Sequence, residues 1–355
     1  MCIRDRLLNT ASASTFLSGF QISEIVKNAI KKPSFSRRAI FDPISIELSD
    51  VKEGKTVWSN KYDKILEDIF EIQDEIVRKI SFTLLGEIEL SSLERAQRKP
   101  TDTLSSYELL LKGKALHHKV QKDALLNALT TFDDAIKADE KNGQAYAWKA
   151  CALGQGLFRG YLEEDFNTVW KQAEDNLKKA RELNENDFEV HRLMSEVSLA
   201  MKDFRAAQRH SKICYEQVPN DPRVLSVYGE VCLRTGKVDE GLDAVKLALE
   251  IDPVAQGKTN ADPRHAAVIF GYYMARDKEG CLEQINNLEE IDFKSWLLTT
   301  KICRDEEHEF SNLDWFQEGK KLFSDKDFEK EVQDFRLNND SATETLISFA
   351  KELFS

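Results

Sequence analysis

The feature that most constrains the fold is a period of 34 residues between His191 and Pro253. Two copies align there without a gap, because Ser195 and Gly229 are 34 residues apart (195 to 229) and each later pair keeps the same spacing. The first copy has Ser195, Ala207, Ser211, Cys214 and Pro219, and the second has Gly229, Gly241, Val245, Ala248 and Pro253. A fixed period of this length is typical of stacked repeats, in which each unit buries its apolar face against its neighbours.

The residue types at the matching positions predict a helical hairpin in each repeat. Small residues near the middle of the first helix and the start of the second let two antiparallel helices approach closely, and the proline ends the second helix. This order of small, small, bulky, small and proline resembles the tetratricopeptide repeat (TPR), although Ser211 is a poor occupant of the bulky position. The resemblance implies a mainly α fold, a right-handed solenoid of helical hairpins.

The repeat continues in both directions with imperfect copies. The small and bulky positions of these copies are occupied by Ala128, Phe132 and Ala135, then by Ala173, Leu177 and Ala180, and downstream by Cys281, Ile285 and Leu288. Amphipathic helices are predicted after them at Ser295–Arg304, Leu313–Phe323, Phe328–Leu337 and Ala342–Phe354. We therefore expect a TPR array over residues 105–292 and a divergent hairpin with a C-terminal cap over 293–355.

The front of the chain has a different pattern. Ile44, Ile46 and Leu48 alternate with polar residues, and an apolar run resumes at Val57 after a turn, which predicts a β-hairpin. Apolar residues at helical spacing then predict a helix over residues 68–89. Because two strands do not form a stable sheet alone, residues 39–99 are expected to be a remnant of a larger α/β domain.

A second resemblance covers this region. The runs Gly54–Asp63 (GKTVWSNKYD) and Asp68–Ile76 (DIFEIQDEI) resemble the end of the TolB-like domain that precedes TPR units in bacterial adenylate and guanylate cyclase-type signalling proteins. The resemblance implies the non-catalytic part of such a protein, with the cyclase domain absent from this chain. Residues 1–38 show no clear pattern, and Met1–Arg6 resembles a translated sequencing adapter, so we expect this start to be non-native.

Composition narrows the classes of function. The net charge of -12 argues against a nucleic-acid groove, which needs clustered Lys and Arg. The six cysteines form no C-x-x-C pair or zinc spacing, so buried free thiols in the cytoplasm are expected. No apolar run is long enough for a membrane span.

The motifs that suggest chemistry all have simpler explanations. Two G-K-T tripeptides, at residues 54–56 and 257–259, lack the earlier glycine of a phosphate loop and are interpreted as turns. His117 and His118 are adjacent and point in different directions on a helix, where they are expected to stabilise its negative end. His308 is expected in a solvated acidic loop. The sequence therefore predicts no catalytic residue, no metal site and no cofactor, and hence no enzyme activity in this chain.

The remaining candidate site is the concave groove of the stack. The TPR resemblance implies that five positions of each first helix face this groove. In the two regular repeats they are Glu189, Arg192, Glu196, Leu199 and Ala200, then Arg223, Ser226, Glu230, Leu233 and Arg234. Charges of both signs beside Leu199 and Leu233 suit an extended or helical peptide, although they equally fit a merely solvated inner face.

The sequence thus favours a non-catalytic TPR module of a bacterial signalling protein that binds a protein or peptide partner. Two alternatives remain at this point. In the first, the chain is the regulatory part of a class III nucleotide cyclase whose catalytic domain lies outside it. In the second, it is a scaffold that self-associates into a homo-oligomer.

Overall fold

The computed structural model describes residues 44–50, 55–62, 89, 93, 104–255 and 258–355. The chain divides into two compact units, Met1–Arg95 and Ala96–Ser355, and each is described by itself. Residues 1–38 lie outside the described residues, as does the helix predicted over 68–89 apart from Glu89. Both G-K-T tripeptides are only partly described, since Gly54 and Gly257 are outside these ranges.

The described part of the first unit is a pair of antiparallel strands, β1 (Ile44–Asp50) and β2 (Lys55–Tyr62). Ile44 pairs with Tyr62 and Leu48 with Trp58. The register shifts after Leu48, so that Ser49 pairs with Thr56 and β2 carries one extra residue. The strands therefore lie on the two apolar runs from which the hairpin was predicted.

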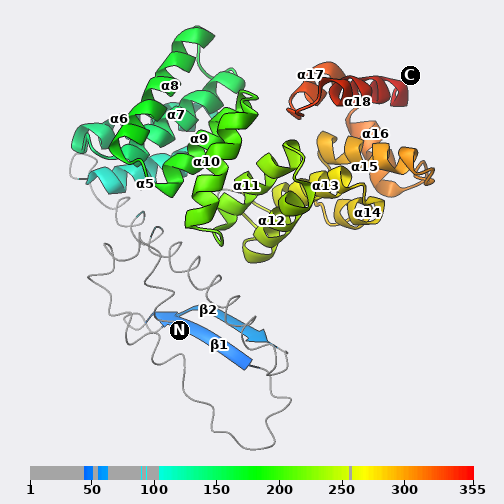
Figure 1. Cartoon of the computed structure of the whole chain (residues 1–355), viewed down its shortest axis with the longest axis horizontal. Coiled ribbons are helices and arrows are strands. Elements are labelled where there is room, and N and C mark those ends of the chain that lie inside the picture. The colour runs from blue at the N-terminus through cyan, green and yellow to red at the C-terminus, as the bar shows by residue number, and fades with distance from the viewer. Residues whose placement is uncertain (1–43, 51–54, 63–88, 90–92, 94–103, 256–257) are drawn as a thin grey trace, which may run out of the picture. The chain divides into compact units, whose positions relative to one another are not determined.

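The second unit is a stack of antiparallel helical hairpins, which Figure 1 shows in chain order from α5 to α18. Each first helix packs on its own second helix and on the next hairpin. The helices are α5 (Ser106–His117), α6 (Lys122–Ala138), α7 (Gly143–Phe158), α8 (Phe166–Leu183), α9 (Phe188–Ala200), α10 (Phe204–Gln217), α11 (Pro222–Arg234), α12 (Val238–Ile251), α13 (Asp262–Ala275), α14 (Lys278–Ile285), α15 (Phe293–Asp305), α16 (Asp314–Leu322), α17 (Phe328–Gln333) and α18 (Asp340–Leu353). The predicted mainly α, TPR-type hairpin stack is confirmed.

The 34-residue period appears directly in the helix boundaries. Helices α9 and α11 begin 34 residues apart (188 to 222), and so do α10 and α12 (204 to 238). Asp187 and Asp221 occupy the N-cap before α9 and α11, where each carboxylate accepts a hydrogen bond from backbone N–H groups of the first turn. The aspartate cap therefore sets the same starting point for each first helix.

The small positions bring the two helices of a hairpin into backbone contact. A Cβ placed on Gly229 of α11 would lie 2.8 Å from the carbonyl oxygen of Gly241, and one on Gly241 would lie 2.9 Å from that of Gly229. In the preceding repeat, Ser195 and Ala207 occupy these positions, and the Ser195 hydroxyl donates a 3.0 Å hydrogen bond to the Ala207 carbonyl. The close approach is therefore made by glycine in one repeat and by a buried hydroxyl in the other.

The C-terminal end of the stack is held by an aromatic core. Trp296 of α15 is fully buried, and its indole N–H donates to the Phe316 carbonyl at 3.2 Å. Three aromatic rings pack against it, namely Phe316 of α16, Phe323 at the C-cap of α16 and Phe354 at the C-cap of α18. Helix α16 also places a small residue against α15, because an added Cβ on Gly319 would collide with the Trp296 ring. Here the small residue makes room for a large ring, whereas Gly229 and Gly241 bring two backbones together.

The helix predicted over Phe328–Leu337 is wrong in its second half, because α17 ends at Gln333. Asp334 is the C-cap residue, and Arg336 has a left-handed backbone φ of 52° that no α-helix continues. Phe335 and Leu337 are buried on either side of this turn, in the core that contains Trp296. The burial of two apolar side chains therefore overrides the helical spacing that the sequence shows here.

We expect Gly241→Ala to destabilise the second unit by roughly 1–3 kcal/mol, because the new methyl group must push two backbones apart. The matched control is Gly154→Ala in α7, where an added Cβ meets nothing within 4 Å. Alanine there should stabilise the helix by about 0.5–1 kcal/mol. Denaturant unfolding of both variants measures the effects, and stabilisation by both substitutions would contradict the backbone contact.

Candidate functional site

A cavity of about 530 Å³ lies on the inner face of the stack. Its wall is built by α5, α7, α9, α11, α13 and α15, with the segment after α17 at the C-terminal side. The lining residues are His117, His118, Trp148, Cys151, Arg192, Glu196, Leu199, Arg223, Ser226, Val227, Glu230, Arg234, Ala255, Arg264, Lys294, Asp334 and Arg336. Charged side chains dominate this wall, whereas the surrounding hairpins are packed through apolar residues.

Most of the residues proposed from the sequence meet in this cavity. Seven of them line it, namely Arg192, Glu196, Leu199, Arg223, Ser226, Glu230 and Arg234. Glu189 is buried at 3% exposure beside Arg192 and is not part of the lining.

The prediction that Leu233 faces the groove is wrong. Its side chain is fully buried in the main apolar core and lies against Gly241, the small residue of the same hairpin. The absence of a side chain on Gly241 opens the space that Leu233 fills, so the side chain is drawn between the helices. The wall of the cavity therefore lacks the second half of the expected apolar stripe.

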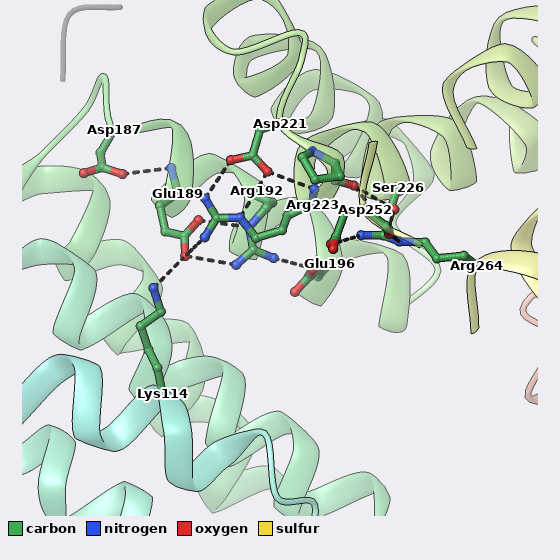
Figure 2. Close-up of polar contacts among 11 residues, drawn as sticks. Lys114, Asp187, Glu189, Arg192, Glu196, Asp221, Arg223, Ser226, Asp252 and Arg264 are labelled. Atoms are coloured by element: carbon green, nitrogen blue, oxygen red, sulfur yellow. Dashed lines mark hydrogen bonds and ion pairs between the residues drawn. The ribbon is translucent and has the colours of Figure 1, made fainter. Parts of the chain in front are cut away.

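Glu189 is the centre of a buried ion-pair network that joins three first helices (Figure 2). Its carboxylate accepts hydrogen bonds from Arg192 Nε at 3.0 Å and Arg192 Nη2 at 3.2 Å. Lys114 of α5 and Arg223 of α11 place their cationic nitrogens 3.8 and 3.9 Å from the same carboxylate. Arg192 also donates to Glu196 at 2.6 Å, toward the cavity.

The network is continued toward α13 by Arg264 (Figure 2). Its guanidinium donates to the Pro222 carbonyl at 3.2 Å, to the Ser226 hydroxyl, and to the Asp252 carboxylate at 3.1 Å. Arg223 is held in turn by Asp221, with Nη2 and the carboxylate 2.6 Å apart. Polar contacts therefore tie the N-terminal turns of successive first helices together along the inner face.

The surroundings of the glutamates push their pKa values apart. Burial by itself raises the pKa of Glu189, but Arg192, Arg223 and Lys114 together lower it far below its usual value. Burial, together with the nearby carboxylates of Glu189 and Glu230, raises the pKa of Glu196 against the lowering effect of Arg192. Glu189 is thus the fixed anion of the network, while Glu196 is the carboxylate that gains a proton more easily.

The α5 and α7 end of the cavity is aromatic and neutral. The rings of His117 and His118 both pack edge-on against Trp148, with centroids 5.5 Å away. Burial, with the nearby Arg192 and other charges, lowers the pKa of His117 to about 4 and that of His118 to about 3. The expected role of these histidines as cations at a helix end is therefore wrong, because both rings are uncharged near neutral pH.

His117 also contacts a cysteine, which raises the question of a nucleophile. The His117 Nε2 atom and the Cys151 Sγ atom are 3.8 Å apart. Burial raises the pKa of the Cys151 thiol to about 12, with Glu196 adding to it, so the thiol stays protonated. A thiol without thiolate character beside a weakly basic imidazole is a structural contact, since nucleophilic cysteines need a lowered pKa.

Several residues of the wall were missed by the sequence analysis, although two signals pointed to some of them. Gly113 of α5 lies against Phe132, just as Gly229 of α11 lies against Val245. When α5 is aligned with α11 by these two glycines, His117 and His118 fall at groove-facing positions. Lys294 follows the N-cap Asp292 by two residues, as Arg223 follows Asp221. Arg336 had no such signal, because it enters from outside the repeats.

Among the described residues, no group of three or more His, Cys, Asp or Glu side chains is placed to hold a metal ion. None of the helices in the same residues has the length and apolar character needed to span a membrane.

Comparison with known proteins gives one sequence match and several similar structures. No protein-family model matches the chain. Over 71 residues it is 31% identical to the putative adenylate cyclase 3 of Rhizobium meliloti (strain 1021), and the match covers 20% of this chain and 12% of that protein.

Several of the similar structures are described as tetratricopeptide repeat proteins. PilF of Pseudomonas aeruginosa has 14% sequence identity and a TM-score of 0.44, with 63% of this chain and 98% of that one covered. YrrB, a TPR protein with an unusual peptide-binding site, has 18% identity and a TM-score of 0.34, with 56% and 85% covered. The assignment of the fold rests on the hairpins themselves.

Loss of the central anion should be costly. We expect Glu189→Gln to destabilise the fold by about 3 kcal/mol, because Lys114, Arg192 and Arg223 lose their shared buried counter-charge. The control is Glu216→Gln, which removes an exposed pair with Lys212 and should cost less than about 0.5 kcal/mol. Equal unfolding free energies for the two variants would argue against the network.

Because His117 and His118 are neutral in the folded chain, we expect the fold to lose stability in mild acid. A histidine whose folded pKa is depressed contributes its full stability above the unfolded pKa of 6.5, and that contribution falls as the pH drops from 6.5 toward the folded value. For His117 the loss one unit below 6.5 is about 1 kcal/mol. Melting temperatures measured from neutral pH down to about pH 5.5 should therefore fall less in His117→Gln than in the parent chain, and identical slopes would contradict this account.

Proposed function

We propose that the chain is a TPR-type protein-interaction module and that it binds a peptide segment of another protein in the inner cavity. The observation that carries this proposal is the wall itself, in which charged side chains from several first helices meet around about 530 Å³ of open space. The volume lies in the range typical of ligand pockets, roughly 300–1,000 Å³. A peptide offers backbone and side-chain groups of both signs, which such a wall can bind by charge-assisted hydrogen bonds.

The ion-pair network behind the wall holds the side chains of the cavity in place before a ligand binds. Arg192, Arg223 and Arg264 are each held by carboxylates or carbonyl groups, so their positions do not depend on a ligand. Side chains that are already ordered lose less conformational freedom on binding, which favours affinity. The concave face is thus suited to a segment that arrives in an extended or helical form.

We further propose that this module belongs to a cytoplasmic signalling protein of the bacterial cyclase type. Two observations support this, namely the 71-residue similarity to a putative adenylate cyclase and the TolB-like motifs between residues 54 and 76. Residues 39–99 are then the end of a TolB-like domain. A genomic reading frame that encodes the metal-binding aspartates of a class III cyclase upstream would support this placement, and a winged-helix domain there would contradict it.

The binding proposal is tested with peptides selected from a random display library on the full chain. Ala255 lines the cavity, so Ala255→Trp should fill part of it and weaken the selected peptides at least about tenfold. The control is Val254→Trp, at the neighbouring residue, whose side chain is exposed and outside the cavity lining. Fluorescence anisotropy measures both affinities.

Two outcomes separate the alternatives. Unchanged binding by Ala255→Trp, with the helical circular dichroism intact, would place the peptide site elsewhere. Light scattering during the same titrations tests self-association, because a homo-oligomer that uses this face should dissociate when the selected peptide binds.

A further inference from the structure

A second hollow, of about 320 Å³, lies between α10, α11 and the N-cap residue of α12. Helix α11 separates it from the inner cavity, because Glu230 and Arg234 line that cavity whereas Tyr228, Val231 and Cys232 line the hollow. The two spaces share no described residue. The second one is called the α10–α11 hollow below, and the proposed function makes no use of it.

Four cationic side chains border the α10–α11 hollow. Arg205, Arg209 and Lys212 lie on one face of α10, at positions i, i+4 and i+7, and Lys237 is the N-cap residue of α12. The described residues that line the hollow include no aspartate and no glutamate. In a chain with a net charge of -12, such a hollow is a local region of positive potential that attracts anions.

The positive charge of the hollow is compensated only in part. Lys212 Nζ lies 3.7 Å from the carboxylate of Glu216, and Lys237 Nζ lies 3.2 Å from that of Glu240. Both pairs are exposed to solvent, and exposed ion pairs are weak. Within the described part of the chain, no carboxylate forms an ion pair with either arginine of the hollow. The hollow therefore has an excess of cations.

Arg209 is held by a neutral, buried partner. It donates from Nη2 to Nε2 of His210 at 3.4 Å, and the His210 residue is 3% exposed. His191 Nε2–H donates to the Glu185 carbonyl at 2.8 Å, so His191 Nδ1 accepts from His210 Nδ1–H at 2.8 Å, which leaves Nε2 as the acceptor for the arginine. Burial, together with His191 and two nearby arginines, lowers the pKa of His210 to about 4. The contact thus positions Arg209 without neutralising its charge.

The size of the hollow favours a small, elongated anion. Arg205 and Lys212 are seven residues apart (205 to 212), which is about 10 Å along a helix axis, so the row offers room for more than one phosphate group. The floor is formed by Val231 and Cys232, which are buried. A volume of about 320 Å³ is at the lower end of the range for ligand pockets, roughly 300–1,000 Å³, and suits a small molecule better than a peptide segment.

We propose that the α10–α11 hollow binds a small compound with two linked phosphate groups. This site goes beyond the proposed function, because it shares no described residue with the inner cavity and needs no peptide. Arginine presents planar donors that fit phosphate oxygens, and lysine adds a compact charge. Four cations along two sides of one hollow suit the several negative charges that linked phosphates carry close together.

The first test is calorimetric titration of the full chain with inorganic pyrophosphate, in buffer without divalent cations. Pyrophosphate should bind at least about tenfold more tightly than orthophosphate, which spans less of the row, and than citrate, whose charges are carboxylates. No binding of pyrophosphate would overturn the site. Equal binding of orthophosphate would overturn the preference for linked phosphates, and equal binding of citrate would overturn the assignment to phosphate.

The source of the phosphates is distinguished by adenosine diphosphate in the same titration. Tighter binding than that of pyrophosphate supports an organic diphosphate as the ligand. Equal or weaker binding supports the inorganic compound.

The variant that tests the residues is Arg205→Gln combined with Arg209→Gln, which should lower pyrophosphate affinity at least about tenfold. Both side chains are exposed, so the helical circular dichroism should not change. The matched control is Lys178→Gln combined with Lys179→Gln on α8, which removes two exposed cations outside the hollow. Full affinity in the arginine variant, or an equal loss in both variants, would overturn the site.

A last comparison separates the hollow from the inner cavity. Ala255→Trp narrows the cavity and should leave pyrophosphate affinity unchanged. Displacement of pyrophosphate by the library-selected peptides, together with a loss of its affinity in Ala255→Trp, would place the anion in the cavity and overturn the second site. If pyrophosphate does not bind and the selected peptides still lose affinity in Ala255→Trp, the proposed function stands and only the phosphate site falls.

Discussion

The contact on which the arrangement depends is the backbone approach between the two helices of each regular hairpin, α9–α10 and α11–α12. Gly229 and Gly241 leave no room for a Cβ on either side. In the preceding repeat, the Ser195 hydroxyl joins the two helices by its hydrogen bond to the Ala207 carbonyl. Close contact at one point fixes how each first helix is rotated about its axis. That rotation in turn decides which positions of the helix face the cavity. The smallest residues of the repeat therefore determine where its charged side chains lie.

Burying charged side chains on the inner face is energetically unfavourable, and nearby groups compensate for it to different degrees along the cavity. Around Glu189 one carboxylate serves Lys114, Arg192 and Arg223, and each arginine has another acceptor. A buried charge is tolerated when it is paired and hydrogen-bonded. Around Lys294 the compensation is weaker, because within the described residues Glu230 pairs with Arg234 alone. The two groups of residues therefore differ in how far the burial of their charges is compensated.

How far the sequence could predict the structure depended on the range of the contacts. The helix boundaries and seven wall residues followed from the local period, because position in a repeat decides the facing of a helix. Leu233 escaped prediction because the space beside it comes from Gly241 on the other helix. Arg336 was beyond reach for a stronger reason. Its carbonyl meets Arg234 across 102 residues of sequence, through a turn whose conformation is set by the burial of Phe335 and Leu337.

The two ends of the cavity differ in chemistry, and this difference gives the wall a polarity. At the α5 and α7 end, Trp148 and two uncharged histidines present aromatic surface, and Lys114 and Arg192 are already engaged over the indole ring at 5.3 and 5.5 Å. At the other end, within the described residues, Lys294 and Arg336 form no ion pair and one nitrogen of Arg234 has no hydrogen-bond partner. A segment that binds along this wall with an acidic group has one favourable direction, because the reverse placement leaves its carboxylate beside neutral rings and the cations uncompensated. A cavity of this kind thus discriminates by the order of groups in its ligand as well as by their charge.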